Sequence, residues 1–131
     1  ARIIEKILPF KSDGIWLDVG DPMAYLETNL AVLRGEVSLH LDPMVRASWW
    51  TRTGDQHSTL SFKSQGAVWL GEDVDIAGEN VFCDSVIGDR AKIPRAVELN
   101  QCIVWADAVV PEGKWSRCIF YDNEVLEIGY L

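Results

Sequence analysis

The chain has 131 residues, enough for one domain or for one small domain with an attached piece. Its 12 Lys and Arg residues are outnumbered by 20 Asp and Glu residues, which gives a net charge of −8. This charge repels nucleic acids and anionic membranes, and no local Lys/Arg cluster offsets it, so we exclude nucleic-acid binding. The longest apolar runs have four or five residues, whereas a membrane helix needs about 18, so we expect a soluble protein.

The N-terminus and the cysteines indicate the compartment. No basic flank followed by a long apolar stretch occurs at the N-terminus, so we predict no signal peptide. The chain also lacks an initiator Met, which suggests that it was cut from something longer. The odd cysteine count, without a CxxC pair or a nearby His, fits neither a disulfide framework nor a zinc site. We expect free thiols in a cytoplasmic protein.

Residues 1–36 are predicted to form a strand, a turn, a second strand and a helix. Residues 15–19 have the composition of a buried strand with one carboxylate, Asp18, near its end. Asp21 is a good N-cap and Pro22 suits the first helical position. Apolar residues then recur at helical spacing, and Gly35 ends the segment. They are Met23, Leu26, Leu30 and Leu33.

Residues 37–66 show no clear period. They contain the Trp49-Trp50 pair and both histidines, His40 and His57. We interpret them as a connector with one or two short strands.

Residues 67–127 contain an internal repeat that decides the predicted fold. Its four copies begin at Val68, Ser85, Cys102 and Cys118, with offsets of 17, 17 and 16 residues. Within each copy, large apolar residues recur every six residues, and three such hexapeptides per coil are typical of a parallel β-helix. The fold class is therefore mainly β. Three inward ladders are expected: Leu70/Ile87/Val104/Phe120, Ile76/Ile93/Val110/Leu126 and Phe82/Leu99/Trp115.

The same register predicts what lies beside these ladders. Cys102 and Cys118 should stack in neighbouring coils, with Cys83 in a different column. One residue before the first ladder, an outward apolar column is expected, covered by the helix at Met23–Leu33 or by another subunit. Trp105 and Tyr121, one residue after the ladder, form a second outward pair that serves packing or offers a platform for a sugar. The outward column consists of Trp69, Val86, Ile103 and Ile119.

The segment Trp16-Leu17-Asp18-Val19-Gly20-Asp21-Pro22, followed by Tyr25-Leu26 and Asn29, resembles the end of the catalytic domain of the sugar-nucleotide pyrophosphorylases. Asp21 departs from that family's pattern, where Thr or Gln is common. The coils are similar to the family's C-terminal left-handed β-helix, and residues 103–110 are especially close to its mannose-1-phosphate guanylyltransferase-like branch. The resemblance therefore implies a remnant of an α/β nucleotidyltransferase domain at 1–36, a connector at 37–66 and a left-handed β-helix at 67–131.

This resemblance also implies an activity for the intact enzyme, which joins a nucleoside triphosphate and a sugar 1-phosphate. Asp18 matches the family aspartate that helps to hold a divalent metal, and Mg²⁺ prefers such hard oxygen ligands. The family's G-G-x-G-T-R-L nucleotide loop is absent here. We therefore expect no catalytic residue, no cofactor and no activity in this chain alone.

Two further functions come from other classes. A hexapeptide-repeat acyltransferase would need a His general base on or beside a coil, but both histidines precede the coils. A non-catalytic assembly or regulatory module is the preferred role of the chain itself. The expected partners are its own upstream catalytic domain and further copies of the chain, most simply in a two-fold dimer.

Overall fold

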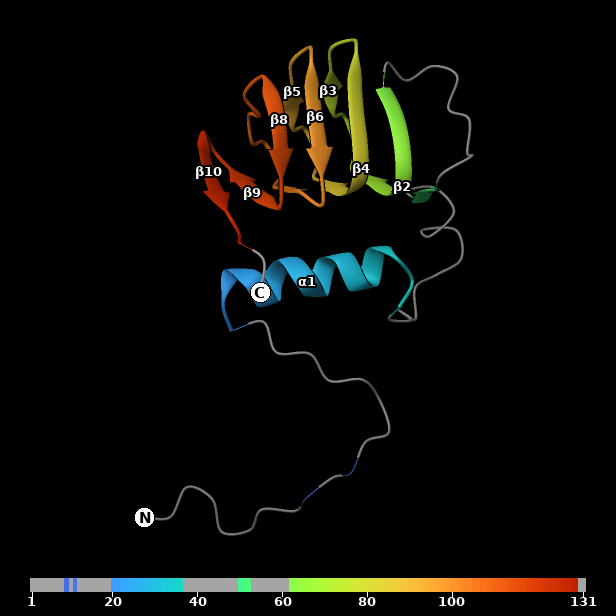
Figure 1. The fold of residues 1–131 in the computed structure, drawn as a ribbon, viewed down its shortest axis with the longest axis vertical. Helices are drawn as coiled ribbons and strands as arrows, with labels where there is room; N and C mark the ends of the chain where they lie inside the picture. The colour runs from blue at the N-terminus through green and yellow to red at the C-terminus, as the bar shows by residue number, and fades with distance from the viewer. Residues whose placement is uncertain (1–8, 10, 12–19, 37–49, 53–61, 130–131) are drawn as a thin grey trace.

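A computed structural model describes residues 9, 11, 20–36, 50–52 and 62–129. These residues form a mainly β structure, a β-solenoid of about three turns with one helix packed along it (Figure 1). Among them, no helix has the length and apolar character needed to cross a membrane.

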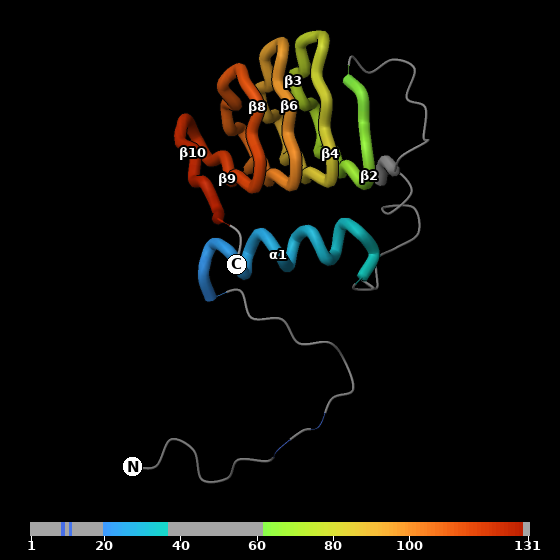
Figure 2. Tube along the Cα trace, in the orientation of Figure 1, coloured from blue at the N-terminus to red at the C-terminus, as the bar shows by residue number. Residues whose placement is uncertain are grey.

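The elements follow one another along the chain as stacked coils, which the trace in Figure 2 shows from α1 in blue to β10 in red. Strand β2 begins inside the segment that the sequence marks as a connector. The elements are α1 (Pro22–Leu33), β1 (Trp50–Arg52), β2 (Phe62–Leu70), β3 (Asp75–Ile76), β4 (Asn80–Ile87), β5 (Lys92–Ile93), β6 (Val97–Asn100), β7 (Ile103–Val104), β8 (Gly113–Ser116), β9 (Cys118–Tyr121) and β10 (Glu124–Glu127).

Parallel pairing between successive coils stacks residues at the predicted offset of 17 or 16 residues. Leu70 pairs with Ile87, Ile87 with Val104, and Val104 with Phe120, which is the first ladder. The third ladder, Phe82/Leu99/Trp115, is also present in register. In the second, Ile76 pairs with Ile93, and the bridge between Lys92 and Val109 carries the same register one coil further. The members of the three ladders other than Leu126 pack into one apolar core inside the coils.

The placement of Leu126 in the second ladder is wrong. The chain turns back after β9, and β10 pairs antiparallel to it, with Leu126 opposite Ile119. Asp122 in the two-residue turn has a left-handed φ of 52°. Leu126 is therefore 36% exposed instead of buried among the coils. At the other end of the sheet, β1 pairs antiparallel with β2, which the sequence did not predict.

Left-handed backbone marks the bends of each coil. Such φ values cost most residues free energy, and Asp and Asn tolerate them better than others. Here they recur in three columns at successive coils, so each coil has three bends. The columns are Asp73, Arg90 and Asp107; Glu79, Ala96 and Gly113; and Asp84, Gln101 and Arg117.

The helix forms where the sequence predicted it. Asp21 is the N-cap, and its Oδ1 accepts a hydrogen bond from the Ala24 amide at 2.7 Å. Pro22 opens the helix, and Gly35 follows its end with a φ of 80°. The leucines at the predicted core positions, Leu26, Leu30 and Leu33, are buried.

The three cysteines are free thiols, as predicted, and occupy two columns. Cys102 and Cys118 precede the paired residues Ile103 and Ile119 and are both buried, whereas Cys83 pairs with Asn100 and is half-buried. Burial raises the pKa of Cys102 to about 12 and also raises the pKa of Cys118 and of Cys83. The thiolate is the reactive form of cysteine. Burial of Cys102 and Cys118 therefore lowers their reactivity twice, because it blocks reagents from the sulfur and disfavours its ionisation.

At pH 8 we therefore expect Cys83 to react first with a thiol reagent, and Cys102 and Cys118 to react only on unfolding. Titration of the unfolded, non-reduced protein should count three thiols; a count of one would contradict free cysteines. Since the folded-state pKa of Cys102 lies above its ordinary value of about 8.5, its contribution to stability is full below that pH. It is lost as the pH rises toward 12, so the urea midpoint should fall over this range.

Close stacking of the coils requires a glycine at position 88. A Cβ there would lie 2.6 Å from the amide nitrogen of Ala106 and 2.9 Å from the carbonyl carbon of Trp105. Because both are backbone atoms, Gly88→Ala is expected to lower the unfolding free energy by about 1–3 kcal/mol. A Cβ at Gly78 meets nothing within 4 Å, so Gly78→Ala is the matched control, expected to be neutral or stabilising. Equal urea midpoints for the two variants would contradict this packing.

Candidate functional site

Helix α1 covers the outward apolar column of the coils. Leu26, Leu30 and Leu33 pack against Ile103 and Ile119 in a second apolar cluster, separate from the core inside the coils. Figure 1 shows α1 lying across the stacked coils at one side. Of the two expected covers for this column, the structure shows the helix. The half-buried members Trp69 and Val86 pack against the same cluster.

A buried arginine ties the helix to the last coil. The Arg117 side chain is 5% exposed and its Nη2 donates to Glu27 Oε1 in α1 at 2.6 Å. Its Nη1 donates to Gln101 Oε1 at 3.2 Å, and Nη2 also donates to the Gly129 carbonyl at 3.4 Å. One guanidinium thus links α1, two bends of the solenoid and the segment after β10. A charge-assisted contact of this kind is stronger than an exposed ion pair.

Beside this interface, three aromatic rings lie in a row at the surface. The Trp105 ring centroid is 6.3 Å from that of Tyr25 and 5.7 Å from that of Tyr121. Ile119 and Leu126 line the same hollow, which has a volume of about 410 Å³. We call these five residues the aromatic surface. Trp105 is 48% exposed, so packing against Tyr25 and Tyr121 covers only part of its ring.

The repeat explains how these rings meet. In the first two coils, the residue after the inward ladder is Gly71 or Gly88, while the third and fourth copies hold Trp105 and Tyr121 there. Alternation along a strand turns Tyr121 outward because its neighbour Phe120 is fully buried. Tyr25 is brought to the row by the first turn of α1. The sequence predicted the Trp105/Tyr121 pair, but it did not predict Tyr25 or Leu126 as neighbours.

Negative charge borders the aromatic surface. Asp21 lines the hollow, and Glu124 pairs directly with Tyr121 across the β9–β10 hairpin. Glu124 and Leu126 lie two residues apart in β10 and so project from the same side of it. Both carboxylates are exposed, and neither takes part in an ion pair with another of the described residues.

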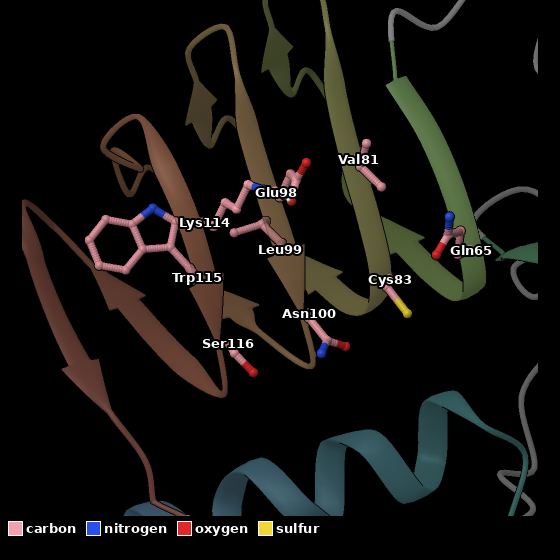
Figure 3. Close-up of a pocket in the computed structure, with 9 residues that line it drawn as sticks. All are labelled: Gln65, Val81, Cys83, Glu98, Leu99, Asn100, Lys114, Trp115 and Ser116. Carbon is pink, nitrogen blue, oxygen red and sulfur yellow. Dashed lines mark ion pairs between the residues drawn. The ribbon is translucent and has the colours of Figure 1, made fainter.

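A second hollow, of about 370 Å³ and with both polar and apolar lining residues, lies on the outer side of β2, β4, β6 and β8 (Figure 3). One column of paired residues there carries mostly polar side chains. Two residues earlier in β6 and β8, Glu98 pairs with Lys114, and their charged atoms are 3.6 Å apart. Because this ion pair is exposed to solvent, it contributes little to the stability of the fold. The aromatic surface combines exposed apolar area with two carboxylates that form no ion pair with a described residue, and it is the stronger candidate for binding. The polar column is Gln65, Cys83, Asn100 and Ser116.

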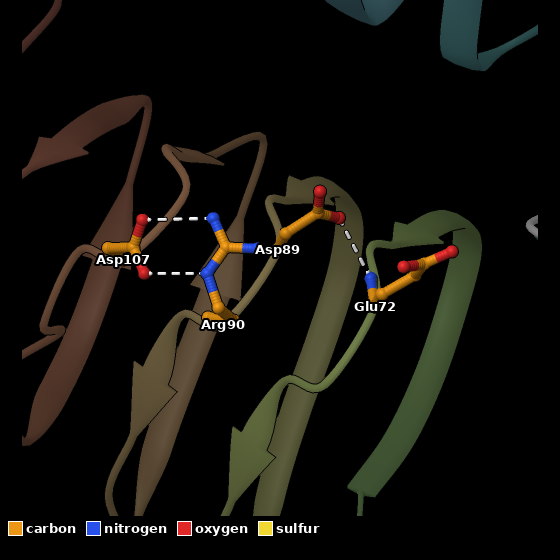
Figure 4. A network of polar contacts seen from close by, with 4 residues as sticks. All are labelled: Glu72, Asp89, Arg90 and Asp107. Atoms are coloured by element: carbon orange, nitrogen blue, oxygen red, sulfur yellow. Dashed lines mark hydrogen bonds and ion pairs between the residues drawn. The ribbon is translucent and has the colours of Figure 1, made fainter.

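Charged groups at one bend column pair with each other between coils (Figure 4). The Arg90 guanidinium donates to both carboxylate oxygens of Asp107, at 2.9 and 3.1 Å. These hydrogen bonds raise the pKa of Arg90 and lower the pKa of Asp107. One coil earlier, Asp89 Oδ1 accepts from the Glu72 amide at 2.8 Å. The polar groups of this bend column therefore form hydrogen bonds between neighbouring coils. Their role is to hold the coils together.

The predicted metal ligand Asp18 lies outside the described residues. Within the described part of the chain, no group of three or more His, Cys, Asp or Glu side chains is arranged to hold a metal ion. Of the six residues predicted for packing or subunit contact, four lie under α1. Trp105 and Tyr121 belong to the aromatic surface, which also includes Ile119 from the column under α1.

Comparison of the chain with known protein families, with curated proteins and with solved structures finds no match.

Proposed function

We propose that the chain is the C-terminal part of a cytoplasmic sugar-1-phosphate nucleotidyltransferase, similar to the mannose-1-phosphate guanylyltransferases, and acts there as a non-catalytic assembly or regulatory module. The order of the two sequence patterns supports this proposal, with residues 16–22 before the coil repeat. The observation that carries it is the packing of α1, which starts within the first pattern at Pro22, along the face of the solenoid. In the proposed enzyme, this packing would hold the catalytic domain, which ends at α1, against the coils.

In the intact enzyme, a phosphate oxygen of the sugar 1-phosphate attacks the α-phosphorus of the nucleoside triphosphate. The bond from that phosphorus to the bridging oxygen breaks, and pyrophosphate leaves with the electron pair. Mg²⁺ neutralises phosphate charge in such reactions, and the Asp18 carboxylate is the group that we assign to it in this chain. We assign the binding of the nucleotide and the sugar to the catalytic domain of the intact enzyme.

We further assign a left-handed, hexapeptide coil to the solenoid. Its support is the six-residue spacing of the apolar residues in the sequence, together with three bends in each coil. The resemblance to the pyrophosphorylase β-helix supplies the handedness. An acyltransferase on the same kind of coil remains the second candidate, disfavoured because residues 62–131 contain no His.

Self-association belongs to the same proposal. Because α1 occupies the outward column, we assign the contact between copies to the terminal coil. Strand β10 ends the sheet order, and its outer edge is the place where a second copy of the chain adds. Light scattering of the chain should then give about twice 14.7 kDa, and a concentration-independent 14.7 kDa would contradict self-association.

Pyrophosphate release tests the enzymatic part. The protein translated from the whole reading frame that contains this sequence should release pyrophosphate from one pair of nucleoside triphosphate and sugar 1-phosphate, dependent on Mg²⁺. Its Asp18→Asn variant should lose about 100-fold or more in kcat/KM. The 131-residue chain is the control, with no turnover and no micromolar binding of GTP, ATP or dTTP by calorimetry. Inactivity of the whole protein towards all such pairs, or turnover by the short chain, would contradict the proposal.

A further inference from the structure

The aromatic surface leaves apolar area uncovered next to charge that has no counterion among the described residues. Trp105, at 48%, is the most exposed large apolar side chain in the described part of the chain, and Leu126 is 36% exposed. Exposed apolar area of this kind usually marks a contact. Helix α1 covers the neighbouring outward column. The aromatic surface lies beside this covered column and stays exposed at Trp105 and Leu126.

Three aromatic rings offer contacts to a cation at this surface. Tyr25 and Trp105 meet edge to face, inclined at 74° with centroids 6.3 Å apart, and Trp105 stays 48% exposed. Cation–π attraction acts within about 6 Å of a ring centroid, so a cation on the exposed part of Trp105 lies within reach of that ring. Tyr121 adds a third ring, inclined at 49° to Trp105.

The charges beside the rings favour the same ligand. Asp21 and Glu124 supply two carboxylates, whereas the nearby Asp107 is already neutralised by Arg90. We propose that the aromatic surface binds an arginine side chain of a protein partner, with the guanidinium against the rings and its charge balanced by Asp21 and Glu124. Guanidinium is preferred to ammonium because it is planar, stacks on aromatic faces and is more weakly hydrated.

The other occupants fit these charges less well. A second copy docking through the same surface would bring its own Asp21 and Glu124 against this pair, in a chain of net charge −8. A neutral saccharide would stack on the rings but would gain no charge attraction from the two carboxylates. The inference needs only the described residues and holds whether or not the chain belongs to a nucleotidyltransferase.

Fluorescence polarisation with a labelled peptide tests the inference. The probe is a seven-residue peptide of sequence GSRLRGS, and the matched probe has glutamine in place of both arginines. We expect the arginine peptide to bind the 131-residue chain at least tenfold more tightly than the glutamine peptide, and less tightly as NaCl rises from 50 to 500 mM.

Variants assign the binding to the surface. Trp105→Ala should weaken binding of the arginine peptide by at least about tenfold. The double variant Asp21→Ser, Glu124→Gln removes both charges while keeping an N-cap residue. It should bind the arginine peptide about threefold or more weakly, and its affinity should depend less on the NaCl concentration. Val109→Ala removes an apolar side chain that is 39% exposed but outside the aromatic surface, and should bind like the parent. Far-UV circular dichroism checks that each variant is folded.

Several results would overturn the inference. They are equal binding of the two peptides, no binding of either, or the same affinity for Trp105→Ala and Val109→Ala. A dimer that Trp105→Ala abolishes would assign the surface to a second copy. A neutral oligosaccharide such as maltotriose that binds through Trp105, with no response to the arginine peptide, would assign it to a sugar.

Discussion

Replacing Ile103 by aspartate is expected to unfold the protein. Ile103 is 2% exposed and lies between Val86 and Ile119 in the outward column, directly beneath α1. The new carboxylate would be buried without a partner, which costs about 3–5 kcal/mol in addition to the lost apolar contacts. Because small domains are stable by about 5–15 kcal/mol, this change removes much or all of the stability.

The matched control is Val109→Asp. Val109 is 39% exposed on the outer side of the coils, so its aspartate remains hydrated and should change the unfolding free energy by less than about 1 kcal/mol. Thermal unfolding followed by circular dichroism compares the two variants. A folded Ile103→Asp protein that dissociates from an oligomer would show that a subunit, and not α1, covers the column.

Truncating Phe120 to alanine should destabilise the protein by about 3–5 kcal/mol. Phe120 is fully buried at the end of the first ladder, next to Val104, and its ring stands at 89° to Trp115 with centroids 5.5 Å apart. Removal of the ring leaves a cavity in the last coil, which has a neighbouring coil on one side only. Phe120→Leu is the control, expected to cost less than about 1.5 kcal/mol because aliphatic residues fill this ladder in the other coils. Similar urea midpoints for the two variants would contradict an inward Phe120.

The repeat made most of the solenoid predictable. A fixed offset of about 17 residues between copies determines which residues stack, and alternation along the strands determines which point inward. The column under α1 followed from the same register. Helix α1 was predictable because its cap, its first proline and its apolar spacing all agree.

The ends and the bends were not predictable in the same way. The last copy keeps the repeat through Phe120 and then turns back at Asp122-Asn123, a polar pair of the kind that marks short hairpins and that could have revealed β10. Most left-handed bend residues are not glycine, so composition does not mark them. The contact between Glu27 and Arg117 joins residues 90 positions apart, and nothing local in the sequence pairs them.

The aromatic surface was predictable only in part. Trp105 and Tyr121 follow from the repeat, since both occupy the position after the first ladder. Tyr25 joins them because α1 docks with its N-terminal turn beside the last coils, and Glu124 joins because β10 turns back. The docking of α1 depends on tertiary packing, and the hairpin interrupts the repeat, so periodicity encodes neither.

The proposed module requires α1 and the coils to unfold as one unit, and native-state hydrogen exchange measures this directly. An isolated helix of 12 residues is marginal in water, so protection of α1 has to come from its packing on the coils. The protection factors of the Leu30 and Leu33 amides should lie within about tenfold of those of the Val104 and Phe120 amides. Near-random-coil exchange of Leu30 and Leu33, with the coil amides still protected, would contradict the account.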